Sequence, residues 1–336
     1  MLENQWYIAA ESRELKKAPL AIMLFDKSIV IFRTTDGSVS ALEDRCAHRN
    51  APLSKGKLCA GKISCPYHGW TYKPSGELDN VPALAKEDVP KISVASYSCI
   101  EQQGYIWICL GDIPPKEIPF SFPKLGESGW SSFKMKTMFD APVEQCLENY
   151  LDCPHATHVH NLWFRTTTGK RVKTITRTLQ DGAEVEYFDE PREKSLIGLT
   201  VFGSKKAKMK HTDRFIAPST SRVDYSFSDS RHVIITSFCT PISETKTQVY
   251  TVVTFKFWRI NWLMRLIFEP VSRFIIKQDV KIMATQRKSI LRFGKEKFVI
   301  SKSDLLLPHI LAWRNALSNG DAPPQSGVDY EQDIYL

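Results

Sequence analysis

The order of apolar and polar residues along the chain predicts a β-rich first domain. β-branched and aromatic runs alternate there with turn signals such as Asp36 and Gly37, a pattern typical of strands joined by tight turns. These runs are 22–25, 28–32 and 104–110. Four prolines then fall within residues 113–123, where neither helix nor sheet is expected, because proline lacks the backbone N–H that both require. We therefore expect one domain over residues 1–118 and a second over residues 119–336.

Strand character returns in the second domain. The apolar runs are 184–188, 196–202, 233–238 and 248–255, with turn signals between them at 180–182 and 241–244. Successive strands joined by short turns pair in antiparallel fashion. We expect an antiparallel sheet, one face of which lines a substrate pocket.

A long helix is expected late in the chain, from Pro270 to about Ile290, because proline is well tolerated in a first helical turn. Asp279 has apolar residues three and four positions away on either side, which places it in the middle of the helix's apolar face. These residues are Ile275, Ile276, Ile282 and Met283. A buried carboxylate without a partner is unfavourable, so Asp279 needs a metal ion or, as the alternative, a Lys or Arg. Another helix is expected near residues 304–317.

Composition and charge narrow the class of protein. The 336 residues are 43% hydrophobic and 24% charged, as in soluble globular proteins. The net charge of +8 suggests an acidic partner or an anionic surface, but no Lys/Arg block or basic-aromatic alternation supports nucleic acid. The helix positions Arg273, Lys277 and Lys281 are either solvated or a docking site for an acidic partner protein.

Targeting signals are also not expected. The first residues lack the pattern of a signal peptide, and the apolar stretch 258–274 is too short and too charged to span a bilayer. Eight cysteines in a chain of this length do not indicate a disulfide scaffold. We expect a cytoplasmic protein with no transmembrane segment.

The densest chemistry lies in residues 149–160, which hold three of the eight histidines. Neutral imidazole and carboxylate are ligands that ferrous iron accepts while it keeps positions open for dioxygen. On a regular helix His155 and His158 would share a face, whereas His155 and His160 would be about 140° apart. His160 can be a ligand only if the helix ends near His158 and the chain curls back. The residues alone leave both pairs open.

The first domain offers a second ligand set in two loops. Cys46 and His48 lie in one loop, and Cys65 and His68 in the other. Two Cys and two His also suit tetrahedral zinc, but a zinc finger usually places its Cys pair together. One thiolate and one imidazole in each loop suit a [2Fe–2S] cluster in which one iron takes two Cys and the other two His.

Residues 46–54 and 65–72 closely resemble the two cluster-binding loops of the Rieske family, with Ala47 and Asn50 where relatives often carry Pro and Gly. The resemblance implies that a Rieske [2Fe–2S] cluster is bound by four residues, Cys46, His48, Cys65 and His68. A stand-alone Rieske ferredoxin would end near residue 115, but here a second domain follows.

Residues 149–160 resemble the mononuclear-iron motif of Rieske oxygenase α subunits. This implies that His155 and His160, rather than His158, bind Fe(II). Asn149 either hydrogen-bonds near the iron or caps the helix. The family places its carboxylate ligand on a late helix in an Asp-x₆-Gln context, which corresponds to Asp279 and Gln286 here. In the family an aspartate matching Asp152 bridges a cluster His of the neighbouring subunit to an iron-ligand His. That implies a head-to-tail homotrimer in which Asp152 links His68 of one chain to His155 of the next.

The resemblance implies an α+β protein, with an all-β Rieske domain and a helix-grip-like catalytic domain in which an antiparallel sheet surrounds a long helix. A separate flavin and/or ferredoxin-type reductase would pass electrons from NAD(P)H to the cluster and on to the iron. Dioxygen would then hydroxylate or oxidatively demethylate an aromatic or other small organic substrate. Similarity to the phthalate dioxygenase and O- or N-demethylase branch favours monooxygenation. The alternatives are a Rieske electron-transfer protein and a zinc-stapled binding module.

Overall fold

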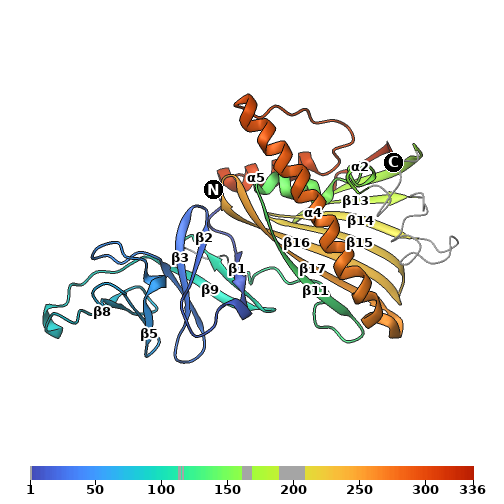
Figure 1. Ribbon diagram of the computed structural model, residues 1–336. Helices are drawn as coiled ribbons and strands as arrows, with labels where there is room; N and C mark the ends of the chain where they lie inside the picture. The colour runs from blue at the N-terminus through green and yellow to red at the C-terminus, as the bar shows by residue number, and fades with distance from the viewer. Residues whose placement is uncertain (1, 113–114, 116, 161–168, 189–208) are drawn as a thin grey trace. The chain divides into compact units, whose positions relative to one another are not determined.

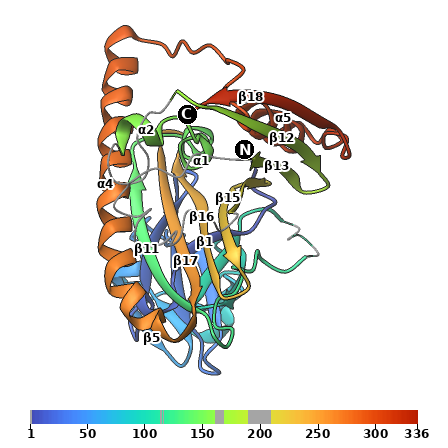
Figure 2. The ribbon, with the colours of Figure 1, turned by 90° about the vertical axis from the view of Figure 1, so that its right-hand side faces the viewer.

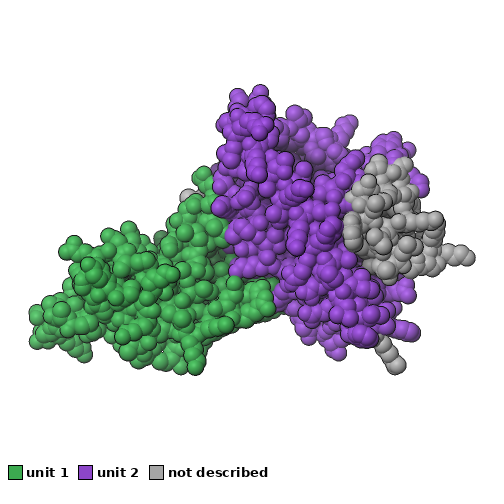
Figure 3. Space-filling view, in the orientation of Figure 1, with its two compact units in different colours: residues 1–121, 242–244 green, residues 122–241, 245–336 purple. Residues whose placement is uncertain are grey.

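The computed structural model describes residues 2–112, 115, 117–160, 169–188 and 209–336. The chain divides into two compact units (Figure 3). Unit 1 comprises residues 1–121 and 242–244, and unit 2 comprises residues 122–241 and 245–336. The strand expected at 196–202 lies outside the described residues. In the described part of the chain, no helix is both long and apolar enough to cross a membrane.

Unit 1 is built from two antiparallel sheets and short 3₁₀ turns (Figure 1). The strand order of the larger sheet is β1-β10-β9-β4-β3-β2, and that of the smaller is β5-β6-β7-β8. The strands are β1 (Tyr7–Glu11), β2 (Leu20–Leu24), β3 (Lys27–Arg33), β4 (Val39–Glu43), β5 (Lys57–Cys59), β6 (Lys62–Ser64), β7 (Thr71–Tyr72), β8 (Leu78–Asn80), β9 (Ser96–Gln102) and β10 (Tyr105–Cys109). The 3₁₀ turns are η1 (Ser12–Glu14), η2 (Leu53–Lys55) and η3 (Lys86–Asp88). The three apolar runs predicted from the sequence are confirmed as β2, β3 and β10.

The core of unit 1 connects its larger sheet to the cysteine-bearing loops. Phe32 and Leu42, which are fully buried, belong to the same apolar cluster as Cys46, Cys65 and Tyr72. The loop residues are therefore anchored by the same packing that stabilises the sheet.

Unit 2 contains one antiparallel sheet of eight strands in the order β11-β17-β16-β15-β14-β13-β12-β18. The strands are β11 (Ser131–Phe139), β12 (Arg171–Leu179), β13 (Gly182–Phe188), β14 (Lys210–Ile216), β15 (Thr220–Ser228), β16 (Arg231–Ser243), β17 (Lys246–Phe257) and β18 (Asp329–Tyr335). The turn expected at 241–244 is wrong for its first three residues, because β16 continues to Ser243. The predicted antiparallel sheet is confirmed.

The helices of unit 2 include one that is much longer than the others. They are α1 (Val143–Leu151), α2 (Ala156–Val159), α4 (Asn261–Phe293) and α5 (Leu307–Asn319), with the 3₁₀ turn η4 (Trp258–Ile260) before α4. The 33-residue α4 lies along the sheet and packs against β11 and β17 (Figures 1 and 2). This arrangement of an antiparallel sheet and a long helix confirms the predicted fold class.

The predicted start of the long helix at Pro270 is wrong, because α4 begins at Asn261 and contains Pro270. Proline removes the bond to the carbonyl four residues earlier, that of Leu266. The Leu266 side chain is 66% exposed, so water reaches this turn of the helix. The helix ends at Gly294, whose φ of 78° is left-handed and whose N–H bonds the Leu291 carbonyl.

The predicted apolar face of α4 is only partly correct. Ile276, Asp279 and Met283 are buried and follow helical spacing, whereas Ile282 is exposed. The carboxylate therefore faces the interior, as the sequence pattern indicated.

Candidate metal centres and pocket

The two loops of unit 1 are built in the same way. In each loop a backbone N–H four residues after the cysteine bonds its carbonyl, from Asn50 to Cys46 at 2.9 Å and from Gly69 to Cys65 at 3.1 Å. The fourth residue is left-handed in both loops, with φ of 59° at Asn50 and 71° at Gly69. Asn is one of the few non-glycine residues that tolerates this conformation, so the departure at Asn50 preserves the loop.

The four candidate cluster ligands lie at the ends of these loops. The rings of His48 and His68 have centroids 4.7 Å apart. Cys46 and Cys65 are buried free thiols. The Nδ1 atom of His48 is buried without a hydrogen-bond partner, as expected of a nitrogen whose partner is a metal. Two thiolates and two imidazoles fit a cluster with mixed ligation.

Tyr72 adds a hydrogen bond to this donor set. Its hydroxyl lies 3.2 Å from the Cys46 sulfur and accepts the Ala47 N–H at 3.1 Å. Burial raises the pKa of Tyr72 above its ordinary value, which keeps the hydroxyl protonated. A hydrogen bond to a ligand sulfur is one of the factors that set the reduction potential of such a cluster.

In unit 2, a break in the helix brings two histidines together. Helix α1 ends at Leu151, and Asp152 adopts an extended conformation with ψ of 99°. His155 and His160 then flank the single turn α2, and their ring centroids are 5.3 Å apart. His158 lies on that turn, is exposed and does not line the pocket. The chain does curl back, although the main helix ends earlier than residue 158.

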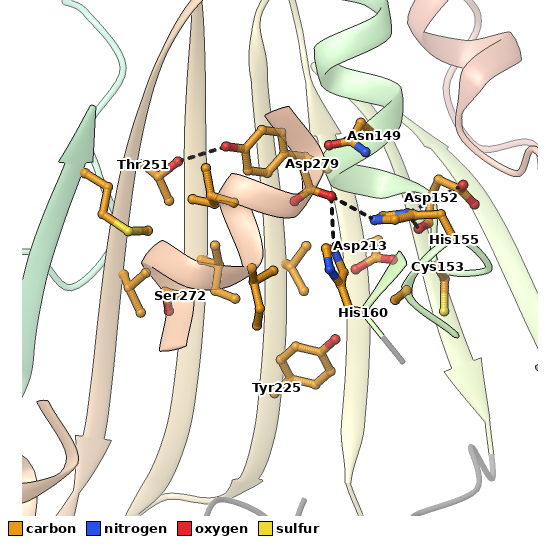
Figure 4. Close-up of a pocket in the computed structure, with 18 of the residues that line it drawn as sticks. Asn149, Asp152, Cys153, His155, His160, Asp213, Tyr225, Thr251, Ser272 and Asp279 are labelled. Atoms are coloured by element: carbon orange, nitrogen blue, oxygen red, sulfur yellow. Dashed lines mark hydrogen bonds and ion pairs between the residues drawn. The ribbon is translucent and has the colours of Figure 1, made fainter. Parts of the chain in front are cut away.

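Asp279 reaches these histidines from α4. Its Oδ1 atom lies 3.0 Å from Nε2 of His160 and 3.6 Å from Nε2 of His155 (Figure 4). The ligand atoms of the three residues all lie within 4.8 Å of one another. Asp279 Oδ1 is buried without a conventional hydrogen-bond partner. Burial alone would raise the Asp279 pKa, but the two histidines lower it, so the carboxylate is ionised. Two imidazoles and a carboxylate fit a mononuclear iron site.

The outer ring nitrogens are held by other groups. His155 Nδ1 hydrogen-bonds the Asp152 backbone carbonyl and lies 3.5 Å from the Asp152 carboxylate. His160 Nδ1 donates to Gln278 Oε1 at 2.8 Å. A protonated Nδ1 leaves the lone pair of Nε2 directed at Asp279, which orients both rings for a common ion. Burial lowers the pKa of His155, but Asp152 and Asp279 together raise it to about 9, so a metal ion that binds Nε2 displaces a proton from that nitrogen.

Gln278 was missed by sequence reasoning. It is adjacent to Asp279 on α4, but nothing in its local sequence indicates that its partner is a histidine on α2. Asn149 lies on α1 and, like Asp152, lines the pocket (Figure 4). Asn149 lies inside α1, so it is not a capping residue.

A pocket of about 790 Å³, including solvent at its mouth, opens beside the three residues. Its walls come from one face of the sheet and from α1, α2 and α4. Most of the sheet-side residues are apolar, among them Met135, Val223, Ile235 and Val253. The lining, largely apolar with a few polar groups, is typical of a site for a small organic molecule. His211 and Asp213, also in the wall, had no sequence signal beyond the alternation of a strand.

Comparison with known families assigns both units. Residues 5–98 match the Rieske [2Fe-2S] domain, and residues 139–318 match the vanillate O-demethylase oxygenase C-terminal domain. The chain is 28% identical to chlorophyllide a oxygenase of Arabidopsis thaliana over 333 residues, which cover 95% of this chain and 58% of that protein. It is 31% identical to the oxygenase component of dicamba O-demethylase of Stenotrophomonas maltophilia over 175 residues, 51% of each chain. The chain thus spans little more than half the length of the curated relatives it matches.

Solved structures share the fold. Dicamba monooxygenase bound to dicamba superposes with a TM-score of 0.77 at 21% identity, covering 95% of this chain and 98% of that one. Pseudomonas putida CBB5 NdmA with caffeine gives 0.76 at 22% identity, covering 95% and 91%.

Proposed function

Because the chain belongs to the family of the vanillate O-demethylase oxygenase C-terminal domain, with a Rieske [2Fe–2S] domain before it, we propose that it is the oxygenase component of a Rieske-type oxygenase. It uses dioxygen and electrons from a reductase to hydroxylate or oxidatively demethylate an aromatic or other small organic substrate, and monooxygenation is the favoured outcome. The observation that carries this proposal is the convergence of His155, His160 and Asp279 at the wall of an apolar pocket.

The chain provides one donor set for each centre. Cys46, His48, Cys65 and His68 would hold the cluster, and His155, His160 and Asp279 would hold Fe(II). When bound, the two centres supply one-electron transfer and the activation of dioxygen, which amino-acid side chains do not provide.

The protein's own contribution is orientation and exclusion of water. Asp152 and Gln278 keep the outer nitrogens of the two histidines occupied, so that both Nε2 atoms face Asp279. The apolar sheet face displaces water from around a bound substrate, while α4 contributes Ile275 and Ile276 to the opposite wall. A substrate carbon is thereby held beside the metal-binding side chains.

A head-to-tail homotrimer completes the proposal. Asp152 of one copy would accept a hydrogen bond from His68 of the neighbouring copy and so link the two kinds of centre. Two observations support this role. His68 is exposed, and the Asp152 side chain is 33% exposed, so both can meet a second chain.

The electron donor is a separate reductase, of the flavin and/or ferredoxin type, that draws on NAD(P)H. Lys277 and Lys281 are exposed on α4, while Arg273 forms an ion pair with Glu269 at 2.7 Å. Docking of an acidic reductase at these residues stays a prediction, as does a cytoplasmic location.

The test is the fate of ¹⁸O₂. The reconstituted protein, a reductase and NADH are supplied with a panel of O-methyl, N-methyl and C-methyl aromatic compounds, and the products are analysed by mass spectrometry. We expect one ¹⁸O atom in the hydroxylated product of the C-methyl compounds. Demethylation is followed by the phenol or amine that it forms, because the released formaldehyde exchanges its oxygen with water. Asp279→Ala should abolish product but leave cluster reduction intact, which separates an oxygenase from a pure electron carrier. Products whose new oxygen derives only from water would contradict the proposal.

A further inference from the structure

His211 and Asp213 form a buried pair on β14. His211 Nε2 donates to Asp213 Oδ1 at 3.0 Å, and the two side chains are only 1% and 4% exposed. Both residues line the pocket, and neither belongs to the three-residue metal site. Figure 4 shows Asp213 and Tyr225 among the side chains drawn around the pocket.

The register of the sheet holds His211 in a stack of three rings. Its cross-strand neighbours are Tyr187 on β13 and Tyr225 on β15. The ring centroids are 4.5 Å and 4.3 Å from that of His211, with interplanar angles of 15° and 18°. Stacking on both faces fixes the imidazole plane, so the direction of its bond to Asp213 is fixed as well.

On the two neighbouring strands, Asp213 is flanked by apolar residues. Its cross-strand neighbours are Val185 and Val223. A carboxylate placed between two valines destabilises the fold unless hydrogen bonds satisfy it, and stability alone would favour an apolar residue here. The hydrogen bond from His211 reaches Oδ1 of Asp213, and a carboxylate that lines the pocket can accept a further bond from a polar ligand at its other oxygen.

The charge of the lining indicates what kind of ligand this is. The described residues that line the pocket include three carboxylates, Asp152, Asp213 and Asp279, and no Lys or Arg. Asp152 and Asp279 face the histidines of the metal site. Asp213 is therefore the carboxylate that remains for a substrate, and it attracts a hydrogen-bond donor and repels an anion.

We propose that Asp213, oriented by His211, is the polar anchor of the substrate pocket. It selects a planar apolar molecule that carries a neutral or cationic N–H or O–H donor, and it disfavours aromatic carboxylates. This inference rests on the proposed function, because it specifies the substrate class of the same pocket.

Three probes of nearly the same shape separate charge from hydrogen bonding. They are 4-methoxybenzamide, a neutral donor; 4-methoxybenzoate, an anion; and 4-methoxyacetophenone, which is neutral and has no donor. Binding to the iron-loaded protein is measured by calorimetry without oxygen, so that no turnover occurs. A hydrogen bond to a charged group predicts that the amide binds the wild-type protein at least about tenfold more tightly than the other two probes.

Asp213→Asn should weaken amide binding about tenfold and reduce the preference for amide over carboxylate to within about threefold. Asp224→Asn is the matched control, because Asp224 lies on the neighbouring strand β15, hydrogen-bonds Arg222 and His232, and does not line the pocket. It should keep the wild-type preference. The wild-type comparison of the three probes stands even if the Asp213 variant misfolds.

Carboxylate binding as tight as amide binding in the wild-type protein would overturn the inference. So would a folded Asp213→Asn protein that keeps the full preference. Neither result affects the oxygenase proposal, because binding is measured without oxygen. Conversely, amide-selective binding without incorporation of ¹⁸O would refute the oxygenase proposal and leave the anchor in place.

Discussion

The Nε2 atom of His160 lies 3.0 Å from the Oδ1 atom of Asp279, with the first residue at the end of α2 and the second within α4. Both side chains are almost fully buried, and the other ring nitrogen of His160 already donates to Gln278. An ionised carboxylate and an imidazole lone pair repel each other in a medium of low polarity unless a proton or a metal ion lies between them. This pairing is the physical basis for the metal site.

His160→Ala should lose the mononuclear iron and keep the absorption spectrum of the cluster. His158→Ala is the matched control, because His158 lies two residues away but is exposed and outside the pocket. It should keep both centres. Iron analysis and visible absorption of the two variants provide the measurement, and loss of iron from His158→Ala instead would identify the other histidine pair as the ligands.

Gln278→Leu should weaken iron binding by about 10- to 100-fold, because the Nδ1 atom of His160 loses the acceptor that orients its ring. The affinity is measured by titration of the iron-free protein with Fe(II) under anaerobic conditions. Gln286→Leu, on an exposed position of the same helix, is the control and should bind iron normally. Equal affinity in the two variants would show that Gln278 has no orienting role.

Glu148→Gln should stabilise the protein above neutral pH. Burial, followed by the charges of Asp152, Asp304 and Glu296, raises the pKa of Glu148 from 4.5 to about 7. The folded state therefore binds this proton more tightly than the unfolded state, and stability falls as pH rises from 4.5 to about 7. At pH 8 the variant should be more stable by about 1 kcal/mol, an amount reduced by solvent screening of a half-buried group.

The difference between variant and wild type should vanish well below pH 4.5, where the carboxyl is protonated in both the folded and the unfolded state. Urea unfolding at a series of pH values measures it. A difference that does not change with pH would place the effect in packing rather than in the charge of Glu148.

The sequence predicted those features whose residues are close together along the chain. The loops around Cys46 and Cys65 follow this rule. The residues alone left the pairs His155/His158 and His155/His160 open, and the family resemblance chose the second. Asp279 could be predicted as a metal ligand although no other ligand lies near it in the sequence, because a carboxylate on an apolar helix face needs a cation. The structure brings Asp279 to the two histidines, although its role as a ligand stays a prediction.

The remaining features depend on which elements lie side by side. Gln278 bonds a residue on another helix, and the ring stack around His211 depends on the register of β13, β14 and β15. Strand β18 was not expected, because its sequence is largely polar and all but one of its residues are at least partly exposed. β18 pairs with β12 through backbone hydrogen bonds, and the pattern of apolar residues does not predict such a pairing.

Asp152→Asn should leave both centres filled and nearly abolish turnover. Asn is almost isosteric, but it replaces one carboxylate oxygen by an NH₂ group that cannot accept. Asp152 offers two charged oxygens, one 3.5 Å from His155 Nδ1 and the other for His68 of a neighbouring copy. Reduction of the cluster by dithionite should stay fast, whereas substrate-dependent reoxidation, followed by rapid mixing, should slow sharply. Asp140→Asn, an exposed carboxylate ahead of α1, is the control. Normal reoxidation in Asp152→Asn would exclude this residue as the link between centres.

The central claim is that one chain holds two separate iron centres, and metal analysis of the anaerobically purified protein tests it most directly. Elemental analysis should give about three irons per chain, with the red-brown absorption of a mixed-ligand cluster. Asp279→Ala should give about two irons with the same absorption, because only the mononuclear iron is lost. A colourless protein with stoichiometric zinc would contradict the account.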